Sequence, residues 1–313
     1  MDTIVNGRRI RLIALDPIKL IPPTADCTPS GYSLDVSGHA IVIWASGRRP
    51  TRWFLSQQRD HDVLDVVETS ARSWPGGVTL FVQPVPHGYV IATSHCAWRP
   101  EGPDLNAVVI DGDGQEVTVG TIGGGINHLQ TTSSGDIWVG YSDEGVYVSG
   151  GWQDKNPGRW GLARFDTSLN KTWDYTPRSL TDEFAPKDVI DDCYVLNVTD
   201  EQVTAYTYSH FPIIQIRPDG EAKVRRTEIR GAGDVLINGI FCALLGGYDK
   251  DSTRVSIGEL DDESYRQHDS GTLDIDRRPA LGSWPVIMSR GDQLSRFLYG
   301  TWSRWKLDVE PPR

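Results

Sequence analysis

Seven side chains of this sequence have the chemistry for proton transfer or for binding a divalent metal. They are three histidines and four carboxylates: His95, His128, His210, Asp143, Glu144, Asp191 and Asp192. A carboxylate beside a histidine brings the pKa of the imidazole into a range useful for acid–base catalysis. The same residue types also suit zinc, manganese or magnesium, with water completing the coordination shell. Five of them are candidate catalytic residues: His128, His210, Asp191, Asp192 and Glu144.

A second set of side chains has the chemistry to bind a ligand, and it comprises Asp143, His95, Arg48, Tyr141, Trp152 and Trp160. The two tryptophans lie in a long Gly-rich segment at 147–160. Segments of this length commonly act as lids or binding loops. Alternatively, both tryptophans pack onto a neighbouring strand and only hold the segment in place. The sequence does not decide between a binding role and a packing role.

Each of these residues also has a purely structural interpretation. Asp and Asn at strand entries often cap backbone N–H groups, and histidines in loops often bond carbonyl oxygens. If the group is functional, its members should line one pocket, with His128 opposite Asp192. A divalent metal at that pocket is an open alternative, and the sequence does not identify its ligands.

The elements that would position these residues follow a repeat. The segment 126–166 contains an apolar strand, a Gly-Asp turn, the strand Ile-Trp-Val-Gly-Tyr and a third strand ending in Asp. Similar second strands end near Ser46, Ser94 and Ser142, and both intervals are 48 residues (94 − 46 and 142 − 94). Three more end near Ser209, Tyr248 and Trp302. Six such strands predict an all-β, six-bladed β-propeller of four-stranded antiparallel blades, with five or seven blades as alternatives.

Turn chemistry predicts the outer hairpins of the blades. Asp-Gly or Asp-Asp turns separate alternating strands near residues 112, 219 and 261. Glycine supplies the positive φ that such turns need. The last repeat is one strand short, whereas Arg9–Leu15 is a spare strand before the first repeat. We therefore expect Arg9–Leu15 to pair with Ser303–Val309, which would close the ring and remove exposed sheet edges.

Propeller topology predicts where the candidate residues lie. The segment entering an inner strand and the loop after the second strand belong to the same face, around the central channel. His128, Asp191 and Asp192 are in entry segments, whereas Asp143, His95 and His210 follow second strands. We therefore expect all of them on one face.

Composition indicates one propeller domain over residues 1–313, since repeat folds are an exception to the usual domain size. The net charge of −11 argues against a nucleic-acid partner, which requires clustered Lys and Arg. No apolar run approaches a membrane span and the first residues do not resemble a signal peptide, so we expect a cytoplasmic monomer without a membrane partner. The four cysteines lack metal-ligand spacing and are expected to be buried free thiols.

The segment 126–166 resembles the propeller repeats of bacterial two-component regulators, which share the strand Ile-Trp-Val-Gly followed by Gly-Leu and Arg-Phe-Asp. It is also similar to NHL-type and virginiamycin B lyase repeats. The resemblance implies a fold and leaves function open. A propeller that binds a small-molecule ligand or a protein is the first functional hypothesis. The alternatives are a lyase or hydrolase with a His/carboxylate pair and a purely structural interaction module.

Overall fold

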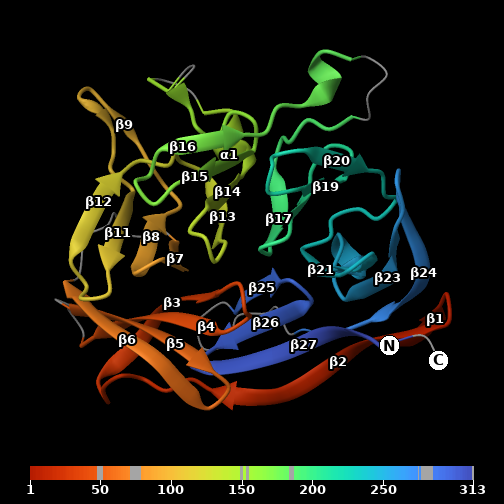
Figure 1. The fold of residues 1–313 in the computed structure, drawn as a ribbon, viewed down its shortest axis with the longest axis horizontal. Helices are drawn as coiled ribbons and strands as arrows, with labels where there is room; N and C mark the ends of the chain where they lie inside the picture. The colour runs from red at the N-terminus through yellow and green to blue at the C-terminus, as the bar shows by residue number, and fades with distance from the viewer. Residues whose placement is uncertain are drawn as a thin grey trace. The chain divides into compact units, whose positions relative to one another are not determined.

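The computed structural model describes residues 1–47, 52–70, 79–148, 151–152, 155–182, 187–273, 275 and 285–311. It is an all-β, six-bladed β-propeller of four-stranded antiparallel blades, as predicted (Figure 1). Its contacts divide the chain into two compact units. Unit 1 comprises Met1–Lys19, Pro177–Val189 and Tyr194–Arg313, and unit 2 comprises Leu20–Thr176 and Ile190–Cys193.

Unit 2 contains three blades. The first has the strands β3 (Cys27–Leu34), β4 (Ala40–Ser46), β5 (Arg52–Arg59) and β6 (Asp62–Ser70). The second has β7 (Leu80–Val85), β8 (Gly88–Thr93), β11 (Ala107–Asp111) and β12 (Glu116–Gly120), with the short ribbon β9 (Trp98–Arg99) and β10 (Gly102–Pro103) between β8 and β11. The third has β13 (Ile126–Thr131), β14 (Ile137–Tyr141), β15 (Leu162–Phe165) and β16 (Lys171–Asp174). Each sheet is a simple antiparallel meander.

Unit 1 contains the other three blades. The fourth has β17 (Cys193–Val198), whose first residue is assigned to unit 2, then β18 (Val203–Thr207), β19 (Ile213–Ile216) and β20 (Ala222–Arg225). The fifth has β21 (Asp234–Asn238), β22 (Phe241–Leu245), β23 (Arg254–Leu260) and β24 (Tyr265–Thr272). The sixth has β25 (Val286–Arg290), β26 (Gln293–Leu298) and β27 (Thr301–Val309), followed in the sheet by β2 (Arg8–Lys19) and β1 (Asp2–Val5).

The second strands form the core of each blade. Every residue of β14, β18 and β22 is buried, because both faces of these strands are covered. The outer strand β24 is mostly exposed or partly buried after its first residue, Tyr265. The named helical elements are short: α1 (Asp143–Val146), η2 (Arg178–Leu180) and η3 (Asp249–Asp251). The outer hairpins predicted near residues 112, 219 and 261 are all present.

The last predicted second strand needs a small correction. It ends at Leu298, and Trp302 belongs to the third strand of that blade. The turn between the two strands is formed by Tyr299 and Gly300, both of which have a positive φ. This mirror-image turn matches the twist of an antiparallel hairpin. An aromatic residue at the first turn position masked the signal in the sequence.

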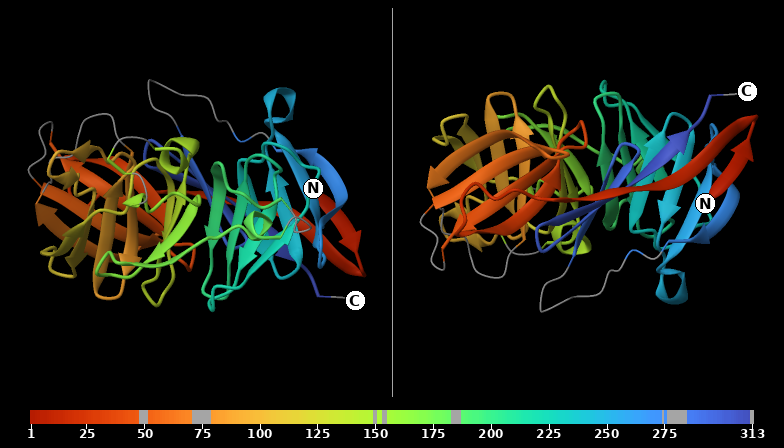
Figure 2. Two further views of the ribbon diagram at one scale, coloured as in Figure 1. Left: turned by 90° about the horizontal axis from the view of Figure 1, so that it is seen from above. Right: turned by 90° about the horizontal axis from the view of Figure 1, so that it is seen from below.

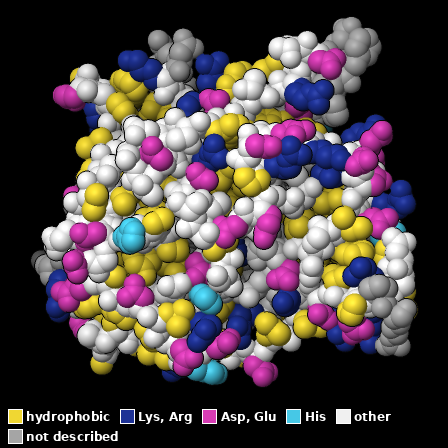
Figure 3. Space-filling view, viewed as in Figure 1, with side chains coloured by type: hydrophobic (Ala, Val, Ile, Leu, Met, Phe, Trp, Pro, Cys, Tyr) yellow, Lys and Arg dark blue, Asp and Glu magenta, His cyan; other side chains and the backbone are white. Residues whose placement is uncertain are grey.

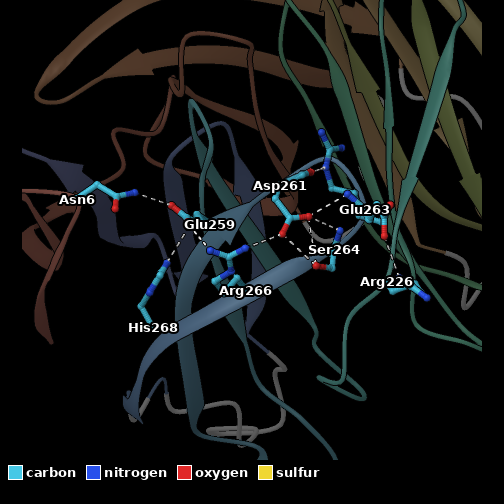
Figure 4. Close-up of polar contacts among 9 residues, drawn as sticks. Asn6, Arg226, Glu259, Asp261, Glu263, Ser264, Arg266 and His268 are labelled. Carbon is cyan, nitrogen blue, oxygen red and sulfur yellow. Dashed lines mark hydrogen bonds and ion pairs between the residues drawn. The ribbon is translucent and has the colours of Figure 1, made fainter.

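The predicted pairing of the N-terminal strand with the last strand is confirmed. β2 runs antiparallel to β27 with the register Ile10↔Val309 through Leu15↔Arg304, and Figure 2 shows the two strands side by side. Ile10 is fully buried in the core of unit 1. The β1–β2 turn is also attached to the fifth blade, since Asn6 donates a hydrogen bond of 3.1 Å to Glu259 (Figure 4). His268 and Arg266 lie beside the same carboxylate.

All four cysteines are free and buried, as expected. Burial raises the pKa of the Cys96 thiol to about 11. No helix in the described residues is long and apolar enough to cross a membrane.

Candidate functional site

The entry to the third blade and the loop after its second strand lie in direct contact in unit 2. The backbone N–H of Ser142 donates to the Gly125 carbonyl at 2.8 Å. The backbone N–H of Ile126 donates to the Ser94 carbonyl, which follows the second strand of the preceding blade. Entry segments and second-strand loops therefore share a face of this unit, in keeping with the topology argument.

Asp143, Asp191 and Asp192, which we call the acidic cluster, lie on this face. The amide of Asn127 donates to Asp192 at 3.1 Å, and the hydroxyl of Tyr147 donates to Asp191. Asp143 begins α1, a helical turn that follows β14 directly. A β-bulge at Asn127, between Ile126 and His128, interrupts the β13–β14 pairing at the point where that amide reaches Asp192.

The environment of Asp192 changes its acidity. Partial burial, together with the nearby Asp143 carboxylate, raises the pKa of Asp192 from its ordinary value of 3.8 to about 6. The hydrogen bond from Asn127 acts in the opposite direction because it stabilises the carboxylate. In Tyr147, the hydrogen bond to Asp191 raises the pKa of the phenol to about 12. Asp192 can therefore exchange a proton near neutral pH.

The other candidates in unit 2 are distributed differently. His128 is half-buried in β13 opposite Gly140, and Asp192 contacts that strand through Asn127. Glu144 and His95 are exposed. Arg48 lies outside the described residues.

Two aromatic candidates of this unit have structural contacts. Tyr141 is fully buried, and its hydroxyl donates to the Ile122 carbonyl at 2.6 Å. Trp152 is also buried and packs edge-on against Trp98, with 5.1 Å between ring centroids. Neither ring is accessible to a ligand, so we leave both out of the site. Trp160 is partly exposed beneath the guanidinium of Arg159.

The metal hypothesis finds no support in the arrangement of ligands. Among the described residues, no group of three or more His, Cys, Asp or Glu side chains could hold a metal ion. Two carboxylates of the acidic cluster instead accept hydrogen bonds from Asn127 and Tyr147. This arrangement suits proton exchange better than metal coordination.

His210 belongs to unit 1, where it lines a cavity of about 710 Å³. Three connections form the walls of this cavity, which we call the aromatic pocket. They are the β18–β19 loop, the segment that leads from β20 into β21, and Tyr248 in the β22–β23 loop. Lys187 contributes from the segment before β17. Of the residues predicted to share one pocket, His210 is the one in this described lining.

Aromatic rings dominate one side of the pocket. Tyr208 and Phe211 lie edge-to-face at 5.7 Å, and Phe211 and Tyr248 do so at 6.2 Å. The hydroxyls of Tyr194 and Tyr248 are 2.9 Å apart, which joins the fourth and fifth blades. Tyr208 is 44% exposed and Tyr248 is 46% exposed. The rings are therefore held in place by their neighbours while part of their surface stays open to a ligand.

The backbone of this pocket adopts an uncommon conformation. Ser209, Phe211 and Asp249 all have a positive φ, at 82°, 54° and 49°. For a bulky residue such as Phe211 this conformation is costly, and it persists only where surrounding contacts enforce it. Tyr206 provides one such contact, since its ring stacks on that of Phe211 with 6.0 Å between the centroids. The buried hydroxyl of Tyr206 in turn donates to the Ile229 carbonyl at 2.7 Å. Strained loop residues of this kind are concentrated at binding sites more often than elsewhere.

Sequence reasoning missed several residues of both sites. Asn127 and Tyr147 contact the acidic cluster, but neither has a distinctive spacing. Tyr208, Phe211 and Tyr248 stand directly beside predicted loop residues. An excess of aromatic residues in two loops after second strands was a usable signal for the aromatic pocket.

Comparison with known proteins gives the fold. No protein-family model matches the chain, and no curated protein matches it. A chain of the mitotic checkpoint complex matches with a TM-score of 0.52 at 8% identity, covering 92% of this chain and 80% of that one. The propeller domain of Myceliophteria thermophila Cps50 matches with a TM-score of 0.49 at 12% identity, covering 90% of this chain and 84% of that one. Virginiamycin B lyase from Staphylococcus aureus matches with a TM-score of 0.44 at 11% identity, covering 96% of this chain and 100% of that one.

At 8% identity, the likeness to the chain of the mitotic checkpoint complex extends to the fold alone. Function has to be argued from the two sites of this chain.

Proposed function

We propose that this protein is a ligand-binding propeller whose site is the aromatic pocket of unit 1. One observation carries the proposal: a cavity of about 710 Å³ lies between second-strand loops and a blade-entry segment, with partly exposed tyrosines in its wall. That volume is in the range of small-molecule sites, which are mostly apolar with a few polar groups. A planar ring packed against Tyr208 or Tyr248 would gain the offset-stacked or edge-to-face contacts that aromatic pairs prefer.

The arrangement of the rings supports a preformed site. Phe211 contacts both Tyr208 and Tyr248, so the wall has fixed neighbours before any ligand arrives. A preformed site loses less conformational entropy when the ligand binds. The ligand is therefore a molecule with a planar ring, of a size that fits the cavity.

Binding of ring compounds tests the proposal. We expect naphthol and indole to bind the parent protein, and Tyr208→Ala to weaken that binding about tenfold, because the substitution removes one wall of the pocket. Isothermal titration measures the affinity, and a crystal soaked with naphthol locates the ring. Tyr147→Ala is the matched control, since Tyr147 is a 65% exposed tyrosine of unit 2. Equal losses in the two variants, or density for naphthol elsewhere, would contradict the proposal.

A second candidate function is proton transfer at the acidic cluster, and one observation favours it. Asp192 is held by Asn127 and has a pKa of about 6, a suitable value for a general acid or base near neutral pH. Asp143 and the Tyr147–Asp191 pair would supply the surrounding polar groups. Such a site would make the protein an enzyme, as in the lyase or hydrolase hypothesis.

The unusual acidity of Asp192 has a measurable consequence for stability. A raised pKa in the folded state means that protonation of Asp192 favours folding below its ordinary pKa of 3.8. That contribution is lost as the pH rises through about 6. Asp192→Asn keeps an oxygen acceptor for Asn127 and carries no charge. We therefore expect this variant to melt at a higher temperature than the parent at about pH 7.5, with the difference vanishing near pH 4.

Asp143→Asn provides the comparison for this prediction. Removal of the Asp143 charge should raise the melting temperature near pH 7.5 by less than Asp192→Asn does. The reason is that burial is the larger cause of the raised pKa of Asp192. Thermal melts of the three proteins across this pH range supply the measurement. If Asp192→Asn and the parent melt alike at every pH, Asp192 is an ordinary surface carboxylate and the second candidate loses its basis.

A further inference from the structure

Two cations that line the aromatic pocket, Lys187 and Arg230, differ from the ion-paired cations elsewhere in unit 1. Arg217, Lys223 and Arg266 all form ion pairs with nearby carboxylates. The side chains of Lys187 and Arg230, by contrast, form no hydrogen bond or ion pair within the described part of the chain. An acidic protein with a net charge of −11 has carboxylates to spare for such cations. Two accessible cations in a cavity wall, without a carboxylate partner among the described residues, are suited to binding an anionic ligand.

Positive side chains outnumber negative ones in the described lining of the pocket. Among the described lining residues, Lys187, Arg226 and Arg230 are accompanied by one carboxylate, Glu228. Arg226 already contacts Glu263 at 3.2 Å (Figure 4), which leaves Lys187 and Arg230 as the available cations. Figure 3 shows Lys and Arg side chains over β20, with Asp and Glu side chains among them. The wall is thus locally positive in a negatively charged protein.

Both available cations are attached to a fixed backbone. The Arg230 carbonyl accepts a hydrogen bond of 2.9 Å from Arg254, which also bonds the Gly246 carbonyl and pairs with Asp251. Next to Lys187, the buried Asp188 accepts hydrogen bonds from the backbone N–H groups of Arg178 and Ser179. The backbone carrying each cation is therefore held in place, although both side chains remain accessible.

We infer that the ligand of the aromatic pocket is a planar-ring compound that carries an oxyanion, either a phosphate or a carboxylate. This inference rests on the proposed function and names the class of ligand. The ring packs against Tyr208 and Tyr248, and the oxyanion accepts hydrogen bonds from Arg230 and Lys187. Charge-assisted hydrogen bonds from guanidinium and ammonium groups to such oxygens are among the strongest in proteins.

Three probes with one ring system test the inference: naphthol, naphthoate and naphthyl phosphate. We expect both anions to bind the parent about tenfold or more tightly than naphthol, and the preference to shrink as salt is added. In Lys187→Gln/Arg230→Gln the preference should disappear while the affinity for naphthol stays unchanged. Arg217→Gln, which removes a cation of unit 1 that does not line the pocket, should behave like the parent. The relative affinities of naphthoate and naphthyl phosphate identify which oxyanion the site favours.

The outcomes separate the inference from the proposed function. If the three probes bind equally well, the anion inference is wrong while the ring site stands. If the anions are preferred equally by the double variant and the parent, other residues bind the oxyanion and the assignment to Lys187 and Arg230 is wrong. Failure of all three probes to bind would overturn the proposed function and the inference together.

Discussion

Deleting residues 1–15 is expected to lower the melting temperature sharply. The deletion removes β1 and most of β2, so β27 would become an exposed edge strand. Val5 and Ile10 would also leave the core of unit 1, where their side chains are 3% and 0% exposed. Thermal denaturation followed by circular dichroism measures the effect. A truncated protein that melts with the parent would show that this strand is dispensable for the fold.

A pair of point variants separates core packing from the loss of strand pairing. Ile10→Ala should cost about 2–5 kcal/mol of unfolding free energy, because it leaves a cavity in a packed core. Ile4→Ala should change it by less than about 0.5 kcal/mol, since Ile4 is 75% exposed. Chemical denaturation measures both values. Similar values for the two variants would mean that the N-terminal strands are not packed as described.

The periodic parts of this fold were predictable from the residues, and the reason is physical. A second strand covered on both faces has to be apolar throughout, so Ile137–Tyr141 and its counterparts repeat a recognisable pattern. Closure by β2 followed from counting strands, because an unpaired edge is unfavourable. The predicted end of the last second strand was wrong for a local reason. The Tyr299–Gly300 turn has an aromatic residue at a positive φ, which turn chemistry does not anticipate.

The candidate sites were only partly predictable, because they depend on contacts between different repeats. Topology predicted that Asp191 and Asp192 lie in a blade-entry segment and that His210 lies in a loop after a second strand. It did not predict the partners, since Asn127 and Asp192 are 65 positions apart and meet only when adjacent blades pack. Tyr194 and Tyr248 are likewise 54 positions apart. Tyr141 was predicted as a binding residue but is buried, because an aromatic residue next to a loop can be part of the core.

Gly231→Ala is expected to abolish most ring binding in the aromatic pocket. Gly231 has φ +68°, and a Cβ at this position would lie 2.8 Å from Cδ2 and Cε2 of Tyr248. The ring of Tyr248 would have to move, which breaks its contacts with the Tyr194 hydroxyl and the Phe211 ring. We expect the affinity for naphthol to fall about tenfold or more. The positive φ adds a folding cost of about 1–2 kcal/mol.

Gly239→Ala is the matched control for this substitution. Gly239 has nearly the same backbone conformation, φ +63°, yet a Cβ there meets no atom within 4 Å. Both variants should therefore lose similar stability from backbone strain, and only Gly231→Ala should lose affinity for naphthol. Tyr248→Leu removes the ring without backbone strain and should reproduce the binding defect, which keeps the test decisive even if Gly231→Ala folds poorly. Naphthol binding that is as strong in Gly231→Ala and Tyr248→Leu as in Gly239→Ala would place the ligand elsewhere.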